Sequence, residues 1–161
     1  MVFLGLVWAS AAAETYVQAV VDQGGQLRIL TNDRREIVPQ KEPNQVAFEK
    51  PAISPDGRAV GWLALYPNCC TSYPIPLKLV IYAGGKLRTF TGTELPVWRW
   101  CFRGGGKQVA FEQETVHGGI GVHYELRDVK TGRILAKYDP DLNSEVLGAR
   151  PEWVADLDSR R

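Results

Sequence analysis

The chain repeats one strand–turn–strand pattern at an offset of 49 residues, in segments 51–62 and 100–111. The first copy turns at Ser-Pro-Asp-Gly, where Pro presets φ, Asp hydrogen-bonds locally and Gly accepts positive φ. The aligned pairs are Gly57 with Gly106, Arg58 with Lys107, Val60 with Val109, and Trp62 with Phe111. A chain of 161 residues that repeats hairpins in this way is expected to be a single all-β domain.

A second echo follows each copy. Segments 79–87 and 126–134 both predict a hairpin closed by a Gly-containing turn and then a basic residue, and segment 20–28 is a weaker third copy. We therefore expect blade-like units near 50–95 and 97–138, the size of a β-propeller blade. Two units and a fragment are too few for a closed propeller, which leaves antiparallel sheets as an incomplete propeller or a two-sheet sandwich.

Residues 53–60, Ile-Ser-Pro-Asp-Gly-Arg-Ala-Val, resemble the turn of TolB-type periplasmic propeller repeats. The spacing in 126–134 is similar to the closing hairpin of that repeat. The resemblance covers about residues 50–138, although Gly104-Gly105-Gly106 replaces Pro-Asp-Gly in the second copy. It implies blade-like sheets and an interaction role in the periplasm, and it transfers no particular partner.

The first residues have the pattern of a secretory signal peptide. Residues 2–8 are apolar and 9–13 are small with A-x-A spacing, which predicts cleavage before Glu14 and a periplasmic or secreted mature chain. No Lys or Arg precedes the apolar run, so a buried N-terminal strand or short helix is the alternative. No apolar run approaches the roughly 20 residues of a membrane-spanning helix.

The charge balance bears on the partner. Lys and Arg number 19 against 18 Asp and Glu, and this near-neutral balance argues against nucleic acid, whose phosphates attract strongly basic proteins. A protein or a cell-envelope component is the expected partner. No cofactor is expected.

Three cysteines, Cys69, Cys70 and Cys101, would meet an oxidising compartment after export. A bridge from Cys69 or Cys70 to Cys101 is the simplest pairing, a bridge between the two neighbours is strained, and three unpaired thiols are the alternative. Their spacing does not suggest zinc.

Alternation in 98–103 predicts a strand with Trp98, Trp100 and Phe102 in the core and Arg99, Cys101 and Arg103 on the other face. Residues 151–157 predict a short C-terminal helix, because Pro151 suits its first turn and Glu152 suits its dipole. Trp153 and Leu157 lie at i and i+4 and would dock on a sheet.

Two loops are candidates for binding. Residues 66–76 are Pro-rich and carry two tyrosines, which offer contact area with a polar tip, and residues 115–121 follow the equivalent strand 49 residues later. Equivalent loops of stacked units leave the same end of a fold, so we expect one two-loop surface there. The candidate binding residues are Tyr66, Tyr73, Arg99, His117 and His123.

These features favour a non-catalytic binding or scaffolding module of the bacterial cell envelope that uses the two-loop surface. One alternative is a metal-assisted hydrolase with His117 and His123 as ligands, since imidazole suits zinc. Another is a structural subunit of an oligomeric ring. Residues 104–107 do not match a phosphate-binding loop, because Gln108 stands where a hydroxyl residue is needed, and they predict a hairpin turn.

Overall fold

The computed structural model describes residues 14–92, 95–117, 121–140 and 150–158. The expected signal peptide, residues 1–13, lies outside these ranges. The described chain folds into three antiparallel sheets and one short α-helix, which confirms the all-β prediction.

Each sheet is a meander in which the strands follow one another in chain order. Sheet A contains β1 (Tyr16–Val21), β2 (Leu27–Thr31) and β3 (Glu36–Ile37). Sheet B contains β4 (Ala47–Ile53), β5 (Ala59–Tyr66), β6 (Ile75–Ala83) and β7 (Lys86–Thr91). Sheet C contains β8 (Val97–Arg103), β9 (Gln108–Gln113), β10 (His123–Asp128) and β11 (Ile134–Tyr138).

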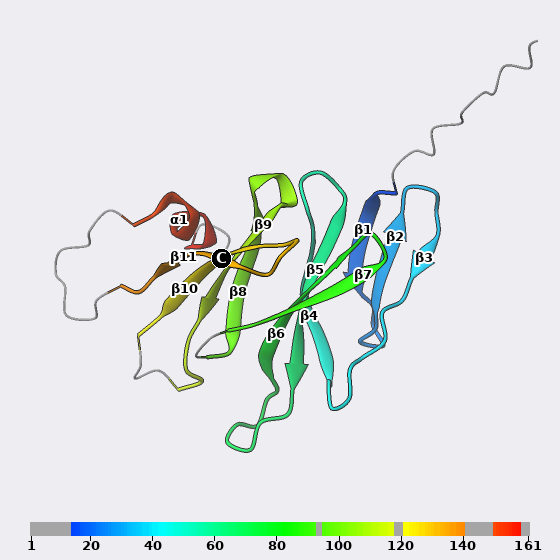
Figure 1. Cartoon of the computed structure of the whole chain (residues 1–161). Coiled ribbons are helices and arrows are strands. Elements are labelled where there is room, and N and C mark those ends of the chain that lie inside the picture. The colour runs from blue at the N-terminus through cyan, green and yellow to red at the C-terminus, as the bar shows by residue number, and fades with distance from the viewer. Residues whose placement is uncertain (1–13, 93–94, 118–120, 141–149, 159–161) are drawn as a thin grey trace, which may run out of the picture.

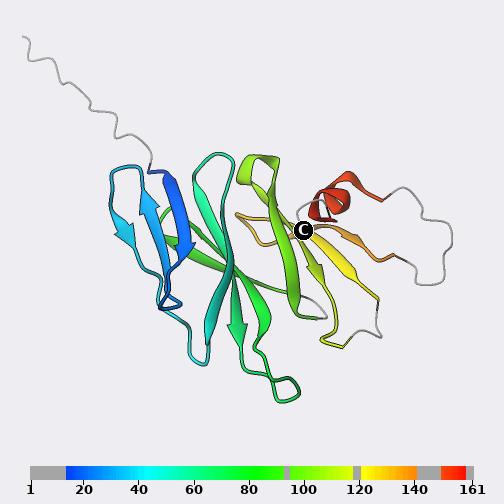
Figure 2. The same ribbon diagram turned by 180° about the vertical axis from the view of Figure 1, so that it is seen from behind.

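The three sheets stand side by side like consecutive blades and do not close into a ring within the described ranges (Figures 1 and 2). The described chain thus has three unclosed sheets where the expected sandwich would have two. Both copies of the sequence repeat occupy the same place in their sheets, since β5 and β9 are each a second strand.

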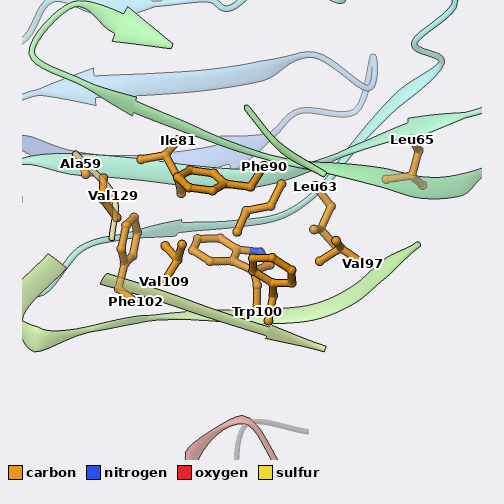
Figure 3. Close-up of a cluster of buried hydrophobic side chains, with 12 residues drawn as sticks. Ala59, Leu63, Leu65, Ile81, Phe90, Val97, Trp100, Phe102, Val109 and Val129 are labelled. Atoms are coloured by element: carbon orange, nitrogen blue, oxygen red, sulfur yellow. The ribbon is translucent and has the colours of Figure 1, made fainter. Parts of the chain in front are cut away.

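The core consists of layers between neighbouring sheets. Sheets A and B enclose one cluster, formed mainly by Tyr16, Leu27, Ile29, Phe48, Val60, Trp62 and Val80. Sheets B and C enclose a larger cluster with Leu63, Leu79, Ile81, Phe90, Trp100, Phe102, Val109 and Phe111 (Figure 3). Val60 and Trp62 of sheet B thus face sheet A. Their repeat partners in sheet C, Val109 and Phe111, face sheet B in the same way, so residues 49 positions apart point toward the preceding sheet.

The far face of sheet C is covered by α1 (Glu152–Asp158), as the sequence predicts. Val154 and Leu157 are buried against Cys101 of β8, and Trp153 is only partly buried beside them. An ion pair between Arg103 and Asp156 holds the helix to the end of β8. None of the helices in the described ranges is long and apolar enough to span a membrane.

The alternation expected in β8 fails at its start. The pairing of β8 with β9 shifts between Val97 and Arg99, which is a β-bulge. As a result Val97 is fully buried and occupies the core position that the sequence predicts for Trp98. Trp98 is half-buried instead and donates from Nε1 to the carbonyl of Glu114 at 2.9 Å. Trp100 and Phe102 do enter the core and meet edge to face with ring centroids 5.1 Å apart.

The expected bridge to Cys101 is wrong. Cys69 and Cys70 are exposed in the turn after β5, whereas Cys101 is buried between sheet C and α1, and none of the three is in a disulfide. The Cys69 thiol donates to Asn68 Oδ1 at 3.7 Å. A hydrogen bond between the neighbouring thiols of Cys69 and Cys70 raises the pKa of Cys70.

Candidate functional site

The two loops expected to bind a partner leave the same end of the molecule. Strands β5 and β9 both run toward the lower end in Figure 1, where loops 66–76 and 115–121 begin; residues 118–120 lie outside the described ranges. Tyr73 is 47% exposed and borders a hollow of about 240 Å³ in the first loop. His117 is exposed in the turn after β9.

Tyr66 does not belong to this accessible surface. Its side chain is buried, and its hydroxyl donates to Glu42 Oε2 at 2.7 Å. Lys78 pairs with the same carboxylate and lies over the tyrosine ring, with Nζ 5.1 Å from its centroid. The hydrogen bonds from Lys78 and Tyr66 lower the pKa of Glu42. The pKa of Tyr66 is raised, mainly because its hydroxyl is buried and secondly because it is hydrogen-bonded to the Glu42 carboxylate. Tyr66 therefore fixes β5 to the chain before β4.

Arg99 and His123 also have partners within the fold. Arg99 stands opposite Glu112 in the β8–β9 ladder and pairs with it, and the Glu112 side chain is almost fully buried. His123 Nδ1 lies 2.6 Å from Asp139 Oδ1. Within the described ranges no group of three or more His, Cys, Asp or Glu side chains converges as a metal site. Of the predicted binding residues, Tyr73 and His117 remain well exposed.

A larger cavity lies between sheets B and C, at the end of β9 opposite to the two-loop surface. Its volume is about 480 Å³. We call it the basic cleft: the cations Lys86, Arg88, Lys107 and Lys130 surround an apolar floor of Ile81, Ala83 and Val129. Figure 3 places Ile81 and Val129 near Ala59, at one end of the B–C core. The floor is thus an extension of the core that reaches the surface.

The β6–β7 hairpin places the first two cations. Gly84 and Gly85 both have positive φ, which is the two-residue turn that matches the twist of antiparallel strands. Lys86 and Arg88 then follow at alternate positions, so both side chains lie on one face of β7. Their cross-strand partners on β6 are Ala83 and Ile81, which belong to the floor.

Lys107 follows the short 3-10 turn η1 (Gly104–Gly106), whose last glycine allows a close approach between sheets. A Cβ on Gly106 would lie 2.8 Å from Cβ of Ser54, and its φ of 99° is unfavourable for other residues. The amide of Val129 donates to the carbonyl of Lys107 at 2.9 Å. This bond ties the β10–β11 turn, which carries Lys130, to η1.

Among the described residues, Asp128 is the only carboxylate that lines the basic cleft, and it is held within its own turn. Asp128 Oδ1 accepts hydrogen bonds from the amide and the hydroxyl of Thr131, each at 2.7 Å. These bonds lower the pKa of Asp128, the hydroxyl contributing most. Asp128 therefore stabilises the turn as an anion and forms no ion pair with Lys107 or Lys130 among the described contacts.

The four cations of the basic cleft have no ion pair within the described ranges. The ion pairs of the described residues join other side chains, such as Arg28 with Asp22 and Arg99 with Glu112. Like charges around a low-dielectric floor focus a positive potential, and such a potential attracts anions. A chain with a net charge of only +1 thus has a locally basic site.

Sequence reasoning did not find this site, because its cations come from three separate hairpins and match no motif. One available signal was the basic residue after each turn glycine, as in Gly85-Lys86 and Gly106-Lys107. This repeated pattern indicated that the hairpins are similar. It did not indicate that different hairpins meet across one cavity.

Comparison with known proteins found no matching family model and no matching curated protein. The functional argument therefore depends on the geometry of the chain itself.

Proposed function

We propose that this protein is a non-catalytic binding module that holds an anionic ligand in the basic cleft. The observation that carries the proposal is that the four cations of the basic cleft surround an apolar floor and have no ion pair within the described residues. A cavity of about 480 Å³ falls in the range of small-molecule and peptide sites, which combine apolar walls with a few polar groups.

The chemistry of the lining favours binding over catalysis. Lys and Arg side chains and one carboxylate are the titratable groups, and that carboxylate already accepts two hydrogen bonds from Thr131. The described residues of this lining offer no nucleophile held by a general base, the arrangement that acyl or glycosyl transfer requires. A ligand with two or more anionic groups and an apolar portion would complement both the cations and the floor.

This proposal keeps the module class and the envelope location expected from the sequence and changes the binding surface. Export still depends on the pattern of residues 1–13 alone. Tyr73 and His117 stay a predicted second contact surface at the other end of the sheets.

Calorimetric titration of the chain from Glu14 onward with citrate and with tripolyphosphate tests the proposal. Replacing Lys107 and Lys130 together by Gln is expected to weaken binding by tenfold or more, since one charge-assisted hydrogen bond is worth about tenfold in affinity. Added salt should also weaken binding, because mobile ions screen exposed charges.

The matched control is Arg34→Asn. It removes one exposed cation far from the basic cleft, and Asn tolerates the positive φ of 65° at that position. The control should bind as the unaltered chain does. Equal affinity in the control and the double variant, or no binding of either anion, would contradict the proposal.

A further inference from the structure

Strand β7 is an open edge that borders the basic cleft. Sheet B has the order β4-β5-β6-β7, so within the described ranges β6 is the only strand hydrogen-bonded to β7 (Figure 1). An open edge presents backbone N–H and C=O groups that can pair with a further strand.

The register of the hairpin identifies which backbone groups point outward. Ala83 pairs with Lys86 across a two-residue turn, and residues that flank such a turn exchange both of their hydrogen bonds. Alternate residues of β7, beginning with Lys86 and Arg88, therefore bond inward to β6. The backbone groups of Leu87, Thr89 and Thr91 point to the open edge.

One observed contact agrees with this assignment. The carbonyl of Thr91, one of the outward positions, accepts a hydrogen bond at 3.3 Å from Nη2 of Arg127, a residue of sheet C and not of β6. Leu87 and Thr89, by contrast, have no hydrogen-bond partner on that side among the described residues. Two successive outward positions are thus available for pairing beside the cleft.

Side chains of an added strand would reach the cations. Neighbouring strands lie about 4.8 Å apart, and residues opposite each other across a ladder share a face. Lys86 and Arg88 face the basic cleft, so alternate side chains of a strand paired with β7 would lie over it. Across the cavity they would meet Lys107 and Lys130.

We infer that the ligand of the basic cleft is an acidic peptide segment that adds to β7 as a fifth strand of sheet B. The inference rests on the function proposed above and specifies its ligand class. Backbone pairing with Leu87 and Thr89 would supply affinity, and carboxylates at every second residue would supply specificity. The competing explanation is that Lys86 and Arg88 merely protect the edge from aggregation, and it predicts no binding.

Fluorescence anisotropy with a labelled peptide of alternating Glu and Thr, six residues long as β7 is, tests the inference. Thr89→Pro removes one outward N–H and leaves the β6–β7 ladder intact, because that N–H does not bond to β6. We expect binding about three- to tenfold weaker than in Thr89→Val, the change that loss of one backbone hydrogen bond gives. A peptide of alternating Lys and Thr should not bind.

A second measurement leaves the protein unaltered, so it does not depend on how the variant folds. Two versions of the Glu peptide carry N-methyl groups on one or the other alternate set of amides. A paired strand points one set toward β7, so one version should lose binding and the other should keep it. Equal binding of both versions, together with equal binding by Thr89→Pro and Thr89→Val, would overturn the inference.

The outcomes separate the inference from the proposed function. If citrate and tripolyphosphate bind through Lys107 and Lys130 while the Glu peptide does not bind, the anion site stands and the strand addition is wrong. If neither the small anions nor the peptide binds, both are wrong, and edge protection explains the charges on β7.

Discussion

Gly61 shows how one residue sets the distance between two sheets. It lies in β5 and faces the B–C core, where a Cβ would overlap the indole of Trp100 and lie 2.6 Å from Ile81 Cδ1. Neither neighbour can withdraw easily, since both are held in the core. Gly61→Ala is expected to destabilise the protein by about 1–3 kcal/mol, the usual cost of overpacking, as measured by urea unfolding.

Gly24 provides the matched control for this substitution. Its added Cβ would come no closer than 3.3 Å to another atom, the half-buried Asp22 carboxylate, and Gly24→Ala should change stability by no more than about 0.5 kcal/mol. If Gly61→Ala were as stable as Gly24→Ala, the core beside Trp100 would be looser than the structure indicates.

At the scale of elements, the contact of Glu42 with Lys78 and Tyr66 joins the chain before β4 to β5 and β6. The pKa of Glu42 is below its ordinary value of 4.5, mainly through the hydrogen bond from Lys78. A lowered pKa means that this stabilisation is complete above the ordinary value and is lost as the pH falls through the folded value. Glu42→Gln should therefore flatten the acid side of the stability profile.

The expected size is modest, because the Glu42 side chain is 38% exposed. We expect Glu42→Gln to lower the free energy of unfolding by at most about 1 kcal/mol at pH 7, with the difference shrinking toward pH 3. Urea titrations at both pH values measure it. A difference that grows on acidification would show that Glu42 does not act as an anion in the fold.

The elements differ in how well the sequence predicts them. Turns carry local signals, and the hairpin at residues 54–57 forms as expected, with Ser54 Oγ donating to Asp56 Oδ1 at 2.6 Å. The bulge that displaces Trp98 has no such signal, because it depends on how β8 pairs with β9. The basic cleft was equally unpredictable from the sequence, since it forms where η1 meets the β6–β7 and β10–β11 hairpins.

At the scale of the whole molecule, each sheet covers the next, and α1 takes the place of a further sheet on sheet C. A head-to-tail ring would need the far faces of both end sheets. The helix already covers one of them, while sheet A still exposes Val17 and Val20. Closing such a ring would require α1 to leave sheet C. The hypothesis of an oligomeric ring therefore depends on how stably the helix is docked.

Thiol labelling measures that docking, because Cys101 lies beneath the helix and is only 3% exposed. A thiol reagent should modify Cys69 and Cys70 quickly and Cys101 slowly in the native protein. Leu157→Ala leaves a cavity under α1 that costs about 2–5 kcal/mol, and it should speed modification of Cys101 alone. The exposed Leu87→Ala is the control and should change no rate.

Two results would contradict this description of the helix. Equal rates at Cys101 in Leu157→Ala and Leu87→Ala would mean that α1 does not protect sheet C. Fewer than three reactive thiols after denaturation would mean that the chain forms a disulfide in solution, in place of the three cysteines outside any bridge seen here. Because Cys101 faces the helix and not the loop of Cys69, a bridge to Cys101 would require the end of the stack to rearrange, and the unaltered chain would then lose the slow labelling phase. A bridge between Cys69 and Cys70 would instead leave the slow phase of Cys101 in place.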